Sequence, residues 1–255
     1  MRPALPALLL AAMLVTIGCL GVDPFGPSRP PSDERALDAV DRSRAAADVD
    51  AYRFAVDGRV EATGNGESLS VDLDGSGVVN ASRRRMSATS RARGTTRSTY
   101  VTGDTAYTEC PRMGWGRENL TRSTPWLDYT PLGRQLALLD RSRVYWHGTE
   151  SVDGTDAAVV TARPTEREFR AVADARGTGG PDLDDGNVRN VTVTAWIDVG
   201  TDRLLRTRTD VRVARRGATA TATLTIRFTD YGEPVDVERP PFDRDALWET
   251  GCPGA

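Results

Sequence analysis

Three cysteines, Cys19, Cys110 and Cys252, are the residues of this 255-residue sequence whose types and positions first suggest chemistry. A thiol can carry a lipid, pair in a disulfide, bind a metal or act as a nucleophile. No CxxC or Cys/His cluster is present, and His147 is the only histidine, which excludes a histidine-rich zinc site. GxSxG, P-loop and GxGxxG motifs are also missing from any strand-to-helix context. We therefore predict no metal, no cofactor and no enzymatic activity, with the cysteines serving as an anchor and a crosslink.

The segment before Cys19 has the organisation of a secretory leader. Arg2 gives it a positive start, and residues 4–17 form an uncharged, mostly apolar run of 14 residues. This run fits a signal-peptide core and is shorter than the roughly 20 residues that a membrane-spanning helix needs. Residues 16–19, Thr-Ile-Gly-Cys, resemble a lipobox, at which a lipoprotein-type signal peptidase cuts before the cysteine. We predict a signal peptide over residues 1–18 and a lipid on Cys19.

The residues after Cys19 favour a membrane anchor. Residues 20–32, LGVDPFGPSRPPS, contain four prolines and two glycines, so we interpret residues 19–32 as a stiff, extended tether. A tether is useful where its far end is fixed to a membrane. We expect the protein to be anchored in the cell membrane by the lipid on Cys19 and to face outside. An ordinary secreted protein and an uncleaved N-terminal anchor are the alternatives.

Two further features fit an exported chain. With Cys19 carrying a lipid, Cys110 and Cys252 are most simply paired in a disulfide, and two free thiols are the alternative. Three sequons place candidate glycosylation sites at Asn80, Asn119 and Asn190.

The charged residues bear on the class of partner. The formal net charge is only -3, which gives no broad basic field for nucleic acid, and we predict no nucleic-acid partner. All 33 basic residues are Arg, and 25 Asp stand against 11 Glu. A lysine-free, aspartate-rich chain is typical of a halophile with a GC-rich genome, in which short carboxylates stay well hydrated.

Most of the chain after the tether has the alternation of β-strands. Residues 32–49 predict a helix, and from Tyr52 onward apolar residues recur at every second position. Turn signals at Gly58, residues 64–66 and residues 75–77 punctuate this first sheet region. Later strands are predicted as hairpins turning at residues 103–104 and 153–154 and as three long strands near residues 191–197, 205–213 and 218–228.

Two segments interrupt the strands. Residues 124–140 predict one or two short helices, and residues 166–175, capped by Thr165, predict another. The fold class is therefore α+β: a large curved antiparallel sheet, or open half-barrel, with an N-terminal helix and two helical insertions covering one face.

Two motifs resemble a known family. Trp196-Ile197-Asp198, followed by Thr201 and by Leu204-Leu205, is similar to a strand-turn-strand motif of the LolA-like lipoprotein-carrier and mycobacterial lipid-carrier lipoprotein superfamily. Residues 100–107, YVTGDTAY, followed by Gly114-Trp115, are similar to a hairpin of the same superfamily. The resemblance spans about residues 33–240 and implies a single half-barrel domain over residues 33–255. It also implies that an acyl chain is shielded in the hollow between the sheet and the helices.

Our leading hypothesis is a non-catalytic surface lipoprotein that binds a lipid, another apolar molecule or an acylated partner in this hollow. The candidate pocket residues are Tyr100, Tyr107, Trp126, Leu136 and Trp196. The alternative is a cell-envelope protein-interaction module whose core is solid and leaves no ligand cavity. A continuous apolar pocket between the sheet and residues 124–140 favours the first hypothesis, and a filled core there favours the second.

Overall fold

The computed structural model describes residues 30–64, 66–110, 113–120, 126–174, 187–215, 217–240, 242, 247–249 and 251–252. The chain divides into two compact units, residues 1–31 and residues 32–255, and every helix and strand given below lies in the second. The predicted signal peptide, Cys19 and most of the tether lie outside the described residues. Among the described helices, none has the length and apolar character needed to cross a membrane.

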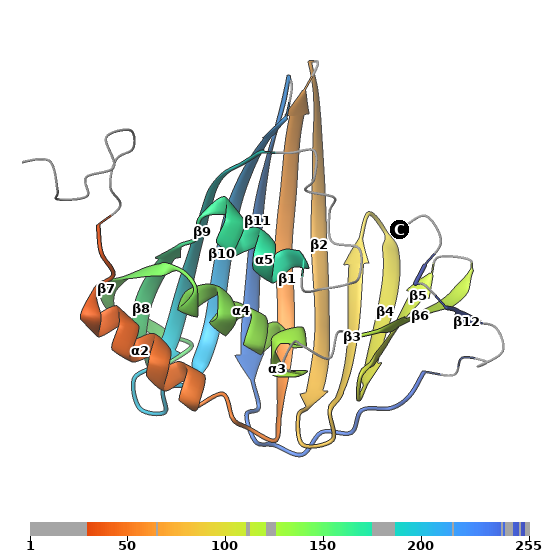
Figure 1. Ribbon diagram of the computed structural model, residues 1–255, viewed down its shortest axis with the longest axis horizontal. Coiled ribbons are helices and arrows are strands. Elements are labelled where there is room, and N and C mark those ends of the chain that lie inside the picture. The colour runs from red at the N-terminus through yellow and green to blue at the C-terminus, as the bar shows by residue number, and fades with distance from the viewer. Residues whose placement is uncertain are drawn as a thin grey trace, which may run out of the picture. The chain divides into compact units, whose positions relative to one another are not determined.

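One sheet of 12 strands organises the second unit (Figure 1). The strands are β1 (Ala51–Gly64), β2 (Glu67–Asn80), β3 (Arg85–Ala92), β4 (Thr95–Thr102), β5 (Thr105–Cys110), β6 (Gly114–Asn119), β7 (Arg143–Val152), β8 (Thr155–Arg163), β9 (Asn187–Asp198), β10 (Leu204–Arg215), β11 (Ala218–Thr229) and β12 (Leu247–Trp248). Their order across the sheet is β12-β6-β5-β4-β3-β2-β1-β11-β10-β9-β8-β7. All neighbours are antiparallel except β12 and β6. Because β7 and β12 form the two edges, the sheet is open, and the predicted α+β half-barrel is confirmed.

The helices lie over one face of the sheet, which we call the inner face (Figure 1). They are α2 (Glu34–Ala45), α3 (Trp126–Tyr129), α4 (Pro131–Asp140) and α5 (Glu166–Asp174). The N-terminal helix is shorter than predicted at both ends: Asp33 is its N-cap and accepts a hydrogen bond from the Arg35 amide, and the helix ends at Ala45, with Ala46 as its C-cap. Thr165 caps α5 as predicted, in a reciprocal arrangement with Glu168.

The inner and outer faces differ along each long strand because successive side chains point to opposite faces. On β1, Tyr52 and Phe54 are buried in the main core with the helices, whereas Arg53 between them is exposed. The same alternation continues across the sheet, so that Phe228 and Ile226 on β11 join the main core. The core therefore lies between the helices and the inner face.

The turns predicted at Gly58 and at residues 75–77 are wrong. Gly58 lies in the middle of β1, and residues 75–77 lie within the uninterrupted strand β2. A Cβ on Gly58 would approach Leu73 and Leu224 to 3.0 Å, and one on Gly77 would approach the Phe54 ring to 2.5 Å. These glycines make room for large neighbouring side chains and do not mark a change of direction.

Tyr52 links the sheet to α4. Its ring is 1% exposed, and its hydroxyl accepts a hydrogen bond from the Leu132 amide at 3.3 Å. Its ring also lies 6.0 Å from that of Phe228 and 5.9 Å from that of Tyr231. Burial raises the pKa of Tyr52 to about 12 from an ordinary value of 10.0.

This shift predicts a loss of stability in alkali. The folded protein keeps the Tyr52 phenol protonated, whereas the unfolded chain ionises near pH 10. The contribution of this phenol to the free energy of unfolding is therefore fully present below pH 10. It is lost as the pH rises from 10 to about 12, by up to about 3 kcal/mol. Urea unfolding across this range measures the fall. Tyr52→Phe should show a smaller one, part of which remains because burial also raises the pKa of Tyr231. Equal slopes for the two proteins would contradict this assignment.

Candidate functional site

The inner face beneath α4 is filled by side chains. Leu132, Leu136 and Leu139 are each 1% exposed and belong to the same core cluster as Val144 and Val193 of the sheet. The backbones of α3 and α4 pack closely at Gly133, where a Cβ would overlap the carbonyl oxygen of Leu127. Helix α4 thus packs directly on the sheet, and the pocket expected between the sheet and residues 124–140 is a solid core in the described part of that segment.

A hollow of about 240 Å³ lies instead between α2 and strands β7–β9. Ala39, Ala158 and Ile197 line it and are at most 5% exposed, which gives it an apolar floor. The Arg35 guanidinium lies 3.8 Å from the centre of the Trp146 ring. The rim residues also carry charge and include an ion pair of 3.0 Å between Arg42 and Asp202. The hollow therefore combines an apolar floor with a charged rim.

The inner face stays apolar where β1, β2, β10 and β11 extend past α5 (Figure 1). Cross-strand neighbours form apolar rows on this face. In one row, Val60 lies between Val71 of β2 and Ala222 of β11, and in the next, Ala62 lies between Leu69 and Ala220. We call this surface the upper inner face. It comprises the half-buried residues Gly58, Val60, Ala62, Val71, Leu73, Val211, Val213, Ala218, Ala220, Ala222 and Leu224, together with Leu69, which is 50% exposed.

The opposite side of the same strands is polar. Arg59 follows Gly58 and forms ion pairs of 3.0 Å with Glu61 and Asp72. Thr219, Thr221 and Thr223 alternate with the alanines of β11. The apolar character of the upper inner face is therefore a property of one face and not of the strands as a whole.

The structure does not bring the five sequence-predicted pocket residues together. Leu136 is in the main core, and Trp126 packs against that core. Tyr100 is buried with Val235 and Val237 on the outer face, where Tyr107 packs against the same small cluster. Trp196 belongs to a third cluster, with Val152 and Ala157.

Trp196 has polar neighbours of its own. Its indole nitrogen donates a hydrogen bond to Glu150, and the Arg206 guanidinium lies 3.9 Å from its ring centre. Arg206 also forms an ion pair of 3.5 Å with Glu150. This three-residue arrangement holds Trp196 in place on the outer face.

The residues that the sequence-based pocket missed are the small ones of the upper inner face. Their alternation is visible along the predicted strand at residues 218–228, whereas the predicted pocket lining consists of four aromatic residues and Leu136. Alanine, valine and glycine on one face, with threonine on the other, were the available signal.

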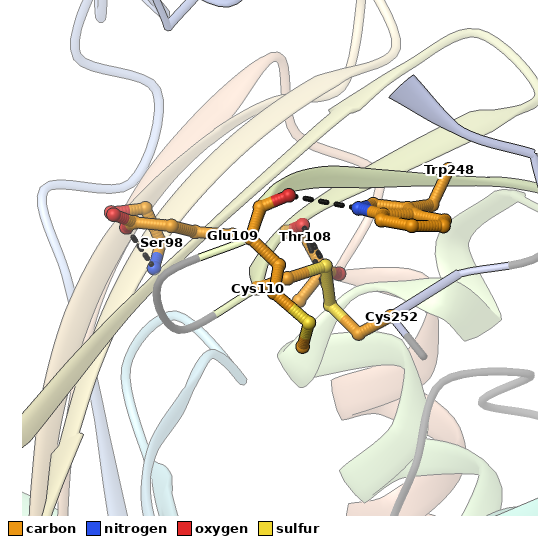
Figure 2. Close-up of a disulfide and its surroundings, with 7 residues drawn as sticks. Ser98, Thr108, Glu109, Cys110, Trp248 and Cys252 are labelled. Atoms are coloured by element: carbon orange, nitrogen blue, oxygen red, sulfur yellow. Dashed lines mark hydrogen bonds between the residues drawn. A yellow bond between two sulfur atoms is a disulfide. The ribbon is translucent and has the colours of Figure 1, made fainter. Parts of the chain in front are cut away.

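The C-terminal segment crosses the outer face and supplies β12, the strand at one edge of the sheet. The described residues between 230 and 252, which we call the C-terminal strap, cover the small cluster that contains Tyr100. The Phe242 ring stacks on that of Tyr107 with a centroid distance of 4.7 Å. Strand β12 then pairs with β6, and Cys252 is joined to Cys110 by a disulfide (Figure 2). The predicted crosslink is therefore present, and it fixes the end of the strap.

The three sequon asparagines differ in their surroundings. Asn80 is half-buried, donates to the carbonyl of Val235 at 3.2 Å and accepts from the Ser82 hydroxyl and the Arg83 amide at 3.0 Å. Its carboxamide thus ties the β2–β3 turn to the strap. Asn119 and Asn190 are exposed, and glycosylation at all three positions stays a prediction.

No protein-family model matches this sequence, and no curated protein matches it either. Solved structures do match. LprF from Mycobacterium bovis is 16% identical with a TM-score of 0.50, over 83% of this chain and 99% of that chain. The lipoprotein LppX from Mycobacterium tuberculosis is 18% identical with a TM-score of 0.49, over 81% and 100%. A LolA-superfamily protein from Nitrosomonas europaea is 10% identical with a TM-score of 0.29, over 83% and 99%. The chain has the fold of LprF, which confirms the half-barrel fold expected from the resemblance.

Proposed function

We propose that this half-barrel chain is a non-catalytic, extracytoplasmic lipoprotein, anchored in the membrane by a lipid on Cys19, that binds a lipid or another apolar ligand. The observation that carries the proposal is the upper inner face. The strands carry apolar residues on the inner face even where they extend past α5. A sheet face that contacts only water is usually polar. Val60, Val71 and Ala222 form one such row and are half-buried, so apolar surface remains for a ligand.

The side chains of this surface suit a narrow apolar chain. Residues that share a face repeat about every 7 Å along a strand, and strands lie about 4.8 Å apart. Leu73 and Leu224 flank Gly58, and in the two rows beyond them the side chains of Ala62, Ala220 and Ala222 are short, so this part of the face is low and apolar. Removing an acyl chain from water is favourable by about 25 cal/mol per Å² of apolar area, with no demand for directional contacts. The apolar floor of the hollow beside α2 supports the same chemistry.

A second candidate function is a protein-interaction module of the cell envelope. The solid core around Leu132, Leu136 and Leu139 favours it, because the space expected to hold a ligand there is occupied by the protein's own side chains. In that case the partner is an envelope protein, and the upper inner face is part of the contact.

A large side chain placed on the upper inner face separates the two functions. Ala222→Trp places a large ring on the inner face, and we expect the amount of apolar compound that copurifies with the protein to fall at least tenfold. Mass spectrometry of an organic extract of the purified protein measures this amount. The matched control is Thr223→Trp, which puts the same ring on the outer face one residue away and should leave the extract unchanged.

Two results would contradict the proposal. Extracts of the unaltered protein that stay empty after purification from its own membranes would exclude a retained ligand. Equal loading of the two tryptophan variants would place the ligand away from the upper inner face. The intact mass of the mature protein tests the anchor independently, since a lipid on Cys19 adds the mass of its acyl chains and removal of residues 1–18 subtracts theirs.

A further inference from the structure

A second hollow lies on the outer face, away from the helices and from the upper inner face. Its volume is about 380 Å³, and it spans strands β1 to β4. Most of its lining side chains occupy outer-face positions, as the register shows: Ala55 alternates with the inner-face residues Phe54 and Val56. The lining residues are Ala55, Val56, Asp57, Asp74, Gly75, Ser76, Thr89, Ser90, Arg91 and Thr96.

The register explains why a hollow forms here. Ala55 lies opposite Ser76, and Ser76 lies opposite Thr89, so three small side chains form a row across three strands. The next row along the strands contains Asp57, Asp74, Arg91 and Thr96, which are longer or charged. The floor is thus made by the row of small residues and one wall by the row of charged residues.

The wall contains an arrangement that stability alone does not favour. Asp57 and Asp74 lie directly opposite each other on adjacent strands, and two like charges in this position repel. One row further along, the same strands place Arg59 opposite Asp72, and these two form an ion pair of 3.0 Å. Departures from local rules of this kind are expected where a site, and not the fold, sets the residue type.

The two carboxylates are held differently. Asp57 forms an ion pair with Arg227 of β11, which fixes its orientation. For Asp74, the described part of the chain shows no ion pair, although Arg91 lies opposite it on β3. Arg91 is the basic residue of the lining, and Arg227, which balances Asp57, lies outside it. The hollow therefore offers carboxylate acceptors, a guanidinium donor and the hydroxyls of Ser76, Thr89 and Thr96.

We propose that this outer-face hollow binds a neutral saccharide. Adjacent sugar hydroxyls each donate one hydrogen bond, which suits a pair of facing carboxylates, and they also accept bonds from a guanidinium or a hydroxyl. A charged ligand meets side chains of both signs here, and an apolar one finds few apolar side chains in the lining. The site is independent of the inner face, so its failure leaves the proposed lipid binding unaffected.

Binding is tested by titrating the isotope-labelled protein with glucose, galactose, mannose and β-linked disaccharides of these sugars. The chemical shifts of the backbone amides are measured by NMR at each step. We expect shifts confined to residues of β1–β4 around Ala55, Ser76 and Thr89. Asp74→Asn keeps the size of the side chain but removes its charge, and it should weaken binding at least tenfold. The matched control is Asp72→Asn, two residues away on the same face and outside the hollow, which should bind as the unaltered protein does.

Each other outcome overturns the proposal. A panel without any shift, shifts located on the inner face, or equal effects of the two asparagine variants all exclude a saccharide in this hollow. Putrescine and calcium chloride serve as cationic probes, and a response to either of them without a response to any sugar also excludes it. Asp74→Asn removes a like-charge contact, so its thermal unfolding midpoint should not fall, which separates lost binding from lost folding.

Discussion

Replacing Cys110 and Cys252 together with serine is expected to lower the free energy of unfolding by about 5 kcal/mol. The two residues are 142 positions apart, and a crosslink that closes a loop of this length removes much of the conformational freedom of the unfolded chain. Urea or guanidinium unfolding of the double variant and of the oxidised protein measures the difference. A change of this size is a large part of the stability of a typical domain.

The disulfide also has a local effect that can be observed separately. A Cβ on Gly116 would approach backbone atoms of Gly251 and Cys252 to less than 3 Å, so the strap end lies directly on β6. Without the crosslink, the end of the strap keeps the pairing of β12 with β6, the Arg117–Glu249 ion pair and two hydrogen bonds, from the Trp248 indole to the Met113 carbonyl and from the Gly251 amide to the Arg117 carbonyl. We expect the amides of β12 and β6 to exchange hydrogen faster in the double variant, while those of β9–β11 change only in line with global stability.

A chemical control accompanies this prediction. Reducing the unaltered protein with a dithiol should reproduce the stability of the double serine variant, and the same treatment of the variant should have no effect. A loss of less than about 1 kcal/mol would show that the unfolded chain is already constrained or that the strap holds without its crosslink.

The fold could be predicted because its strands are long and one-sided. The alternation of alanine and threonine over residues 218–228 indicated β11 directly, and Thr165 marked the start of α5. Gly58 and Gly77 resemble turn positions in the sequence for a physical reason. A turn and a strand position under a large side chain both favour glycine, and Gly77 beneath Phe54 is the second case. Only the register, which depends on distant strands, separates the two.

The site could not be predicted to the same extent. Tyr100 and Val101 are neighbours on β4, but Val101 belongs to the main core and Tyr100 to the outer cluster. Alternation shows that they face opposite ways and does not show which face the helices cover. The strap, which follows much later in the chain, packs Val235 and Val237 against Tyr100 and makes it a core residue of the outer face. The alternation of Val235 and Val237 with acidic residues spans only residues 235–238, between prolines, and is too short to indicate a segment crossing the outer face.

Leu136 lies where the sequence-based pocket and the observed core lead to different expectations. As a lining residue it would be spared from tight packing, and its truncation would change ligand binding more than stability. In the structure it is 1% exposed and belongs to the main core. We therefore expect Leu136→Ala to lower the free energy of unfolding by about 2–5 kcal/mol, through lost burial and the cavity that it leaves. Denaturant unfolding measures this loss.

The matched variant is Leu69→Ala, the same truncation on the upper inner face at a side chain that is 50% exposed. Because this leucine buries little area, its loss should cost less than about 1 kcal/mol, whereas the apolar compound recovered per folded molecule should decrease. For Leu136→Ala, recovery per folded molecule should be unchanged. If Leu136→Ala instead keeps its stability and loses its ligand, the ligand binds beneath α4 and not on the upper inner face. The two leucines thus separate the side chains that hold the half-barrel together from those that its ligand covers.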